Sequence, residues 1–129
     1  KRQHNDNPVF YIQYAHARIC KVLEHWGGDI STLKMHKSSI LDSQAELKLI
    51  KSISIYPEII IQATDELAPH QIANFLKDCA AELHSYYNDS KFLVKDEKLK
   101  IARLCLINSA KYVLKNGLNL LGIEAPQRM

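Results

Sequence analysis

The 129-residue sequence lacks the usual signs of a secreted, membrane or disulfide-bonded protein. Its three cysteines are an odd, widely spaced set that fits neither a disulfide framework nor a C-x-x-C metal pattern. No apolar run approaches the roughly 20 residues that cross a membrane. There is no signal-type segment, and the chain does not begin with Met, so we expect a piece of a longer protein. A reducing, cytoplasmic compartment without a membrane partner is expected.

Signatures of catalysis are also missing. The six histidines are spread singly, and His16 and Cys20 form a possible metal pair on one helix face that no second pair completes. No Gly-rich phosphate loop, serine elbow or alternating strand–helix pattern occurs, and a Cys/His dyad has no supporting signature. We therefore predict no catalytic residue, no metal and no cofactor in this chain.

The residues that are present indicate one all-α domain spanning 1–129. Apolar residues make up 47%, which is enough for a core, and the net charge of +3 permits nucleic-acid binding without predicting it. The spacing of apolar residues favours a bundle of about five helices, some of them kinked. We expect a polar linker at 1–6, a loop at 29–42 with short helical pieces at most, and an extended tail at 122–129.

Capping residues and proline set the expected helix bounds. Asn7 and Pro8 begin the first helix, and Gly27 and Gly28 end it. A second helix starts near Ser43, is interrupted at Pro57, and restarts over 58–67. Two further helices are expected over 69–88 and over 97–121.

One face of the first helix carries aromatic rings and positive charge together. Tyr11, Tyr14, Arg18 and His25 fall within a narrow arc, with Lys21 beside it. Bases stack on aromatic rings and phosphates pair with Arg and Lys, so this face is a candidate for single-stranded nucleic acid. The alternative is that these tyrosines lie at the core boundary with buried rings and solvated hydroxyls.

Two further groups are candidates for contact with nucleic acid. The helix over 69–88 ends with His84, Tyr86 and Tyr87, where the histidine either contacts RNA or caps a carbonyl. The last helix carries a one-sign stripe that is either a phosphate-binding surface or a solvated face. This stripe consists of Lys100, Arg103, Lys111 and Lys115.

Several segments, in order, resemble the C-terminal anticodon-binding domain of arginyl-tRNA synthetases. The first is Asn7-Pro8-Val9-Phe10-Tyr11-Ile12-Gln13-Tyr14-Ala15-His16-Ala17-Arg18-Ile19. The others are Glu66-Leu67-Ala68-Pro69-His70 followed by Ile72-Ala73-Asn74-Phe75-Leu76, Leu83-His84-Ser85-Tyr86-Tyr87-Asn88, Arg103-Leu104-Cys105-Leu106, Val113-Leu114-Lys115-Asn116-Gly117-Leu118-Asn119-Leu120-Leu121-Gly122-Ile123 and the final Arg128-Met129. The resemblance covers nearly the whole chain.

The resemblance implies a helical bundle that binds the anticodon arm of arginine tRNA, through Tyr14, Arg18, Tyr86, Arg128 and Met129. ATP, Mg²⁺ and arginine would then bind a catalytic domain of the same chain, and this domain alone would be an inactive, monomeric fragment of the ligase. Two alternatives stay open: the equivalent domain of another class I synthetase, and a helical protein-interaction module without RNA binding.

The expected loop at 29–42 contains a second likeness to a synthetase motif, and this one is misleading. Lys34-Met35-His36-Lys37-Ser38 matches the K-M-S-K-S phosphate signature of class I synthetases at four of five positions. In that family the signature precedes the Asn-Pro-Val helix, whereas here it follows it, and the nucleotide-binding fold is missing. We interpret the segment as a basic loop near RNA or as a plain loop.

Overall fold

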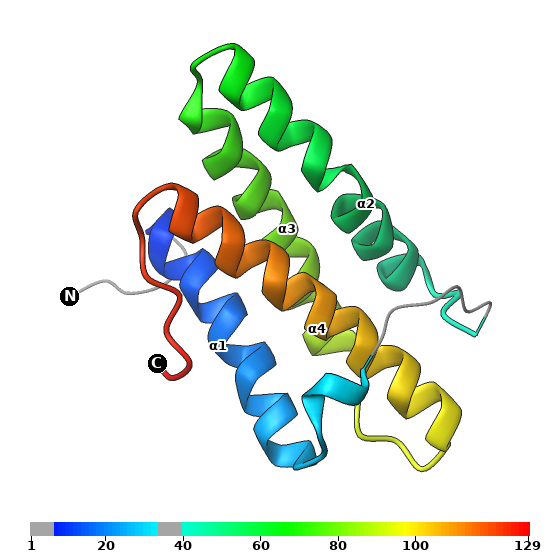
Figure 1. Cartoon of the computed structure of the whole chain (residues 1–129). Helices are drawn as coiled ribbons and strands as arrows, with labels where there is room; N and C mark the ends of the chain where they lie inside the picture. The colour runs from blue at the N-terminus through cyan, green and yellow to red at the C-terminus, as the bar shows by residue number, and fades with distance from the viewer. Residues whose placement is uncertain (1–6, 34–39) are drawn as a thin grey trace.

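The described part of the chain is built from four α-helices and one short 3₁₀ turn (Figure 1). The computed structural model describes residues 7–33 and 40–129. The elements are α1 Pro8–Trp26, η1 Ile30–Thr32, α2 Gln44–Asp65, α3 Pro69–Asp89 and α4 Glu97–Leu120. No strand occurs within these residues, so the predicted all-α class is confirmed. The predicted linker at 1–6 and the Lys34–Ser38 segment lie outside the described residues.

Local capping sets the ends of the helices, as the sequence predicted. The Asn7 side chain accepts from the Phe10 amide, and Gly27 ends α1 in the left-handed conformation at φ 73°. At the start of α2, Ser43 and Glu46 form a capping box in which each side chain accepts from the other residue's amide. These interactions span three or four residues, which is why they can be read from the sequence.

The predicted break at Pro57 is wrong, because α2 runs through it without interruption. Proline removes one helical hydrogen bond and disfavours helical geometry at the preceding Tyr56. That residue is held by tertiary contacts instead: its hydroxyl donates to Asn116 of α4, and its ring packs on Phe75 of α3. Within residues 7–33 and 40–129 the expected five helices are therefore four, with α2 replacing two short ones.

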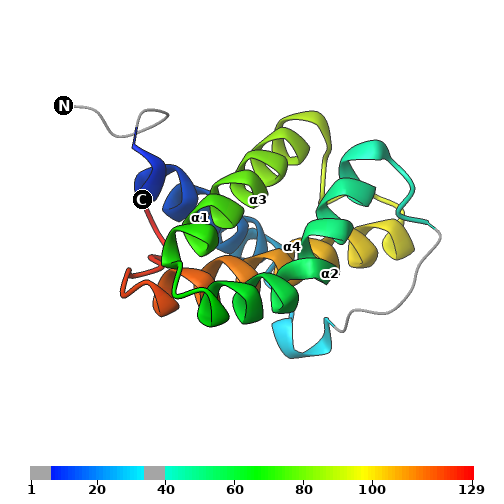
Figure 2. The ribbon, with the colours of Figure 1, turned by 90° about the horizontal axis from the view of Figure 1, so that it is seen from above.

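Helices α3 and α4 share the centre of the bundle, because each of them packs against the other three helices (Figures 1 and 2). The buried residues of α4 consequently occupy more than one narrow stripe of its circumference. They are Leu104, Cys105, Leu106, Ile107, Asn108, Ala110, Val113, Leu114, Gly117 and Leu118.

The chain after α4 turns back and runs along α1 (Figure 1). Gln13 Nε2 donates to the Glu124 carbonyl at 2.8 Å, and His16 Nδ1 lies 2.9 Å from the Pro126 carbonyl. Because a carbonyl oxygen can only accept, His16 carries its proton on Nδ1. Burial lowers the pKa of His16, which favours the neutral ring. The last residues are thereby brought to the face that carries Tyr14 and Arg18.

Candidate nucleic-acid interface

Arg18 of α1 lies between two tyrosine rings from different helices. Its guanidinium carbon is 4.7 Å from the centroid of the Tyr14 ring and 4.2 Å from that of Tyr87, at the end of α3. A guanidinium over an aromatic face is attracted by the electron density of the ring, and its planar shape stacks well. The three side chains therefore form one aromatic–cationic stack at the α1–α3 contact.

His84 fixes the direction of the Arg18 guanidinium. Its Nε2 lies 3.2 Å from the Tyr11 carbonyl, and its Nδ1 lies 3.1 Å from an Arg18 nitrogen. The carbonyl can only accept, so Nε2 donates and the Nδ1 lone pair accepts from Arg18. Burial, and then the positive charge of Arg18, lower the pKa of His84, which favours the neutral ring that this geometry needs. The carbonyl that His84 binds belongs to α1, so this histidine does not cap the end of its own helix, and its contact with RNA stays a prediction.

The stack borders a groove of about 460 Å³ between α1, the end of α3 and the chain end, which we call the tail groove. Nine residues line it: Tyr14, Ala17, Arg18, Lys21, Glu24, Tyr87, Gln127, Arg128 and Met129. The groove brings together five predicted site residues that are up to 115 positions apart in the sequence (14 to 129). Three cationic side chains face one carboxylate in it, so its lining is positively charged.

Arg128 is held at the edge of the groove by an exposed ion pair. Its guanidinium lies 3.0 Å from the carboxylate of Glu24, and the two side chains are 83% and 65% exposed. A pair as exposed as this contributes little to stability and can open at small cost. Arg128 therefore remains available to a phosphate, and Met129 beside it is half exposed.

Tyr86 does not lie on this surface. It is fully buried, its hydroxyl donates to Glu46 at 2.7 Å, and its ring packs edge-on against Phe92. Burial and the neighbouring Glu46 carboxylate raise the pKa of its hydroxyl. The spacing from Cys79 and Leu83 places Tyr86 on the core face of α3. The predicted contact between its ring and RNA is therefore corrected to a role in the core.

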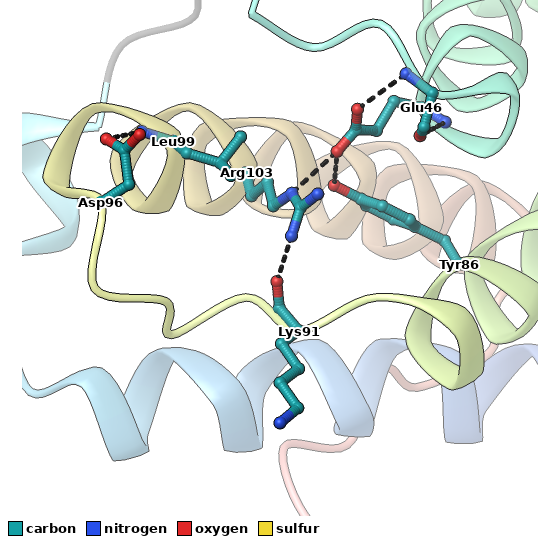
Figure 3. A network of polar contacts seen from close by, with 7 residues as sticks. Glu46, Tyr86, Lys91, Asp96, Leu99 and Arg103 are labelled. Carbon is teal, nitrogen blue, oxygen red and sulfur yellow. Dashed lines mark hydrogen bonds and ion pairs between the residues drawn. The ribbon is translucent and has the colours of Figure 1, made fainter.

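Arg103 belongs to the same interior network and not to a phosphate-binding stripe (Figure 3). Its Nε donates to Glu46 at 2.9 Å, and another guanidinium nitrogen donates to the Lys91 carbonyl. Glu46 is 1% exposed. Burial opposes its charge, but hydrogen bonds from Tyr86, Ser43 and Arg103 outweigh it, so the pKa of Glu46 is lowered. Arg103 therefore neutralises a buried carboxylate and ties α4 to α2 and to the 90–96 loop.

The remaining predicted cations do not form one surface with Arg103. Lys100 pairs with Glu97 at 3.1 Å on its own helix. Lys111 contacts the Tyr112 ring and lines a neighbouring pocket that also includes Gln127 and Arg128. Lys115 is exposed. The predicted stripe is thus split: Arg103 faces the core, whereas Lys111 adjoins the tail.

Tyr11 contacts His84, which orients Arg18, and is not one of the residues that line the tail groove. Its ring centroid lies 4.6 Å from that of His84, whose Nε2 also binds the Tyr11 carbonyl. Glu24 and Gln127 are groove residues that the sequence analysis missed, because nothing local to either indicates that the tail returns to α1.

In residues 7–33 and 40–129 no group of three or more His, Cys, Asp or Glu could hold a metal ion. None of the described helices is long and apolar enough to span a membrane.

Comparison with known proteins bears directly on this site. A family model described as the DALR anticodon binding domain matches residues 12–129. Arginine–tRNA ligases of Nitrosomonas eutropha and Nitrosomonas europaea are 52% and 50% identical over all 129 residues. The chain covers 22% of the length of each of these two relatives.

Solved structures agree with the sequence matches. A Campylobacter jejuni structure assigned to arginyl-tRNA synthetase has a TM-score of 0.88 at 29% identity, covering 99% of this chain and 28% of its own. The arginyl-tRNA synthetase of Thermus thermophilus has a TM-score of 0.80 at 32% identity, covering 92% of this chain and 21% of its own. The resemblance predicted from the sequence motifs is confirmed. Because the family match includes α2, α3, α4, most of α1 and the tail that closes the groove, this chain belongs to the DALR anticodon binding domain family.

Proposed function

We propose that the chain is the anticodon-binding domain of an arginine–tRNA ligase and that its tail groove holds an unpaired base of the anticodon loop of arginine tRNA. One observation carries the proposal: Arg18 lies between Tyr14 and Tyr87 in a groove that Arg128 and Met129 border. Aromatic faces beside fixed positive charges are what single-stranded RNA requires.

The chemistry divides between base and phosphate contacts. A splayed base packs against the exposed part of Tyr14, a residue that is 36% exposed and whose ring is held by Arg18 and Phe10. Main-chain groups of Gln127 and Met129 supply donors and acceptors to the base edge. Lys21 and Arg128 pair with the phosphates on either side. Base contacts thus give discrimination, and phosphate contacts give most of the affinity.

The ligation reaction belongs to the remainder of such a ligase. The chain spans about a fifth of the length of its curated relatives. The resemblance implies ATP, Mg²⁺ and arginine for the remainder of the full-length enzyme, and among the described residues of this chain no group of three or more His, Cys, Asp or Glu could hold a metal ion. This domain contributes only the positioning of tRNA. Action as a monomer and a cytoplasmic location are parts of the same proposal.

Titration with RNA tests the proposal. The chain is titrated with arginine tRNA, and with the same tRNA altered at the middle anticodon base, at two salt concentrations. We expect tighter binding of the unaltered tRNA, by roughly fivefold or more for one base, and weaker binding of both at higher salt. Arg18→Ala should weaken binding roughly tenfold, because it removes a charge and loosens both tyrosine rings.

Lys51→Ala provides the matched control for lost positive charge. Lys51 is an exposed lysine on α2, which packs against α3 and α4 on the side away from α1 (Figure 1). Its variant should bind arginine tRNA almost as tightly as the unaltered chain. Equal binding of both tRNAs would mean that the domain attracts RNA by its charge and does not discriminate between anticodon bases. Absence of salt-dependent binding, in this chain and in the full-length ligase, would favour a protein-interaction bundle instead.

A further inference from the structure

A second pocket, of about 390 Å³, adjoins the tail groove, and we call it the side pocket. Its lining consists of Lys21, Val22, His25, Tyr87, Ser90, Lys91, Phe92 and Leu93. Lys21 and Tyr87 line both cavities, so they form the wall between them. Whatever lies along the tail groove can therefore continue past the Tyr87 ring into the side pocket.

The lining of the side pocket combines apolar area with positive charge. Val22, Phe92 and Leu93 provide the apolar part, and the Leu93 side chain is 42% exposed although it is large and hydrophobic. Two lysines and a histidine provide the basic part, and no acidic side chain is among the residues that line it. A ligand that fits carries negative charge next to a flat apolar surface, which describes a nucleotide.

The pocket is held in shape by the interior network. Arg103 donates to the Lys91 carbonyl and binds the buried Glu46, which anchors the loop after α3. Figure 3 shows the Lys91 side chain leaving that carbonyl on the opposite side from Arg103, toward α1. The Tyr87 ring is fixed by Arg18 on one face and by Phe92, with ring centroids 6.0 Å apart. A nucleotide would thus enter a preformed site.

We propose that the side pocket binds the unpaired nucleotide next to the one in the tail groove, with Tyr87 as a wedge between the two bases. This rests on the proposed function, since it assumes that RNA occupies the tail groove. The base packs on Leu93 and on the partly exposed Tyr87 ring, which the buried Phe92 supports. Its phosphates lie between Lys21 and Lys91. Neighbouring bases are then separated by an aromatic ring, which lets each be read alone.

Paired changes in the chain and in the RNA test this subsite. The RNA is the anticodon stem-loop of arginine tRNA with one loop base at a time removed to leave an abasic site. The variants are Leu93→Ala, which shortens the apolar wall, and Lys91→Met, which removes the charge but keeps the side-chain length and the main-chain bond to Arg103. Lys95→Met is the matched control, because Lys95 is an exposed lysine of the same loop that does not line the pocket.

Leu93→Ala should weaken binding of the intact stem-loop about fivefold, comparable to the weaker base–side-chain stacks. That loss should vanish with the RNA that is abasic at one position, and that position should be adjacent to the one at which the effect of Tyr14→Ala vanishes. Lys91→Met should reduce the slope of log affinity against log salt concentration by about one, which corresponds to the loss of one phosphate contact. Lys95→Met should change neither quantity.

The outcomes separate this inference from the proposed function. Full binding by Leu93→Ala and Lys91→Met, with weak binding by Arg18→Ala, would overturn the side pocket and leave the tail groove intact. Losses of equal size with every abasic RNA would also overturn it, because they would show no assigned nucleotide. If Arg18→Ala also binds with unchanged affinity, both the side pocket and the proposed function of the tail groove are overturned. Circular dichroism spectra and unfolding midpoints of the variants exclude misfolding as the cause of a loss.

Discussion

Arg18 and Arg103 show that two arginines with the same charge have different uses because of their neighbours. The Arg103 guanidinium is matched by the Glu46 carboxylate at 2.9 Å and is largely buried. The Arg18 guanidinium contacts two aromatic rings and a neutral histidine, so its charge is not cancelled by an acidic partner in these contacts. Arg103 stabilises the fold, and under the proposed function Arg18 provides positive charge for the RNA.

Removal of the Glu46 carboxylate should be costly. Glu46→Ala leaves the Arg103 charge, the Tyr86 hydroxyl and the Ser43 amide without their acceptor. Breaking such a buried pair destabilises by about 3 kcal/mol or more, and urea unfolding measures this loss. Glu24→Ala, which removes an exposed pair with Arg128, should cost less than about 1 kcal/mol. Similar losses in the two variants would contradict the structural role of the network.

His16 and His84 should make the fold sensitive to acid. Burial lowers the pKa of both rings below the ordinary 6.5, so the unfolded chain binds more protons than the folded one as the pH falls. The stability they contribute is present above about pH 6.5 and is lost as the pH falls through the lower, folded-state pKa values. The free energy of unfolding should therefore decrease between pH 7 and pH 5.

A double variant identifies the source of this pH dependence. Glutamine can still donate to the Pro126 and Tyr11 carbonyls but does not titrate, so His16→Gln with His84→Gln should flatten the profile over this range. Denaturant unfolding at a series of pH values provides the measurement. A profile equally steep in the double variant, or stability that rises on acidification, would assign the dependence to other groups.

At the scale of the elements, the close approach of α3 and α4 depends on Gly117. A Cβ added there would lie 2.6 Å from Cδ2 and 3.0 Å from Cγ of Leu76, which is fully buried. Helix α2 shows the converse: tertiary contacts of Tyr56 carry it through a proline that local rules would place at a helix end. In both cases the partner helix decides what the local sequence tolerates.

Gly117→Ala should therefore destabilise the protein although alanine is the better helix former. Overpacking costs about 1–3 kcal/mol, against a gain of about 1 kcal/mol in helix propensity. We expect a net loss of about 1 kcal/mol in chemical denaturation. Asn119→Ala, at an exposed position of the same helix, should gain slightly. Gly117→Ala as stable as the original would mean that Leu76 can move aside at no cost.

At the scale of the whole molecule, the tail connects the end of the chain to its first helix. The contacts that hold it involve the carbonyls of Glu124 and Pro126. Residues 127–129 extend beyond them, are exposed, and line the tail groove. The carbonyls that hold the tail and the residues that line the groove are therefore different parts of the tail, so the two can be tested separately.

Deletion of residues 127–129 should leave the fold intact and weaken RNA binding. Only the exposed pair between Arg128 and Glu24 is lost from the fold, so the unfolding free energy should change by less than about 1 kcal/mol. Affinity for arginine tRNA should fall roughly tenfold with the loss of one phosphate contact and one groove wall. Binding by the truncated chain at full affinity would exclude the tail from the interface.

Prediction from sequence identified the face of α1 on which three of the groove-lining residues lie, whereas their contact with RNA stays a prediction. Tyr14, Arg18 and Lys21 lie within two turns of α1, and their common face follows from helix geometry. Prediction failed for Tyr86 and Arg103, which share the helix spacing of surface candidates. Both bind Glu46, which lies 40 positions from Tyr86 and 57 positions from Arg103 in the sequence. No local pattern contains such a partner, so the periodicity alone left them on the surface.

The amino-acid sequence by itself determined the helices and their ends, because capping, proline and apolar spacing act within about four residues. Its motifs also indicated the family. Only the tertiary structure decided that α2 passes through Pro57, that Tyr86 and Arg103 serve the core, and that the tail lies on α1. Those outcomes depend on contacts between residues that are distant in the sequence, such as His16 and Pro126, which are 110 positions apart. Burial sets the energies of these contacts. Packing therefore selects which of the predicted aromatic and cationic residues are buried and which line the tail groove.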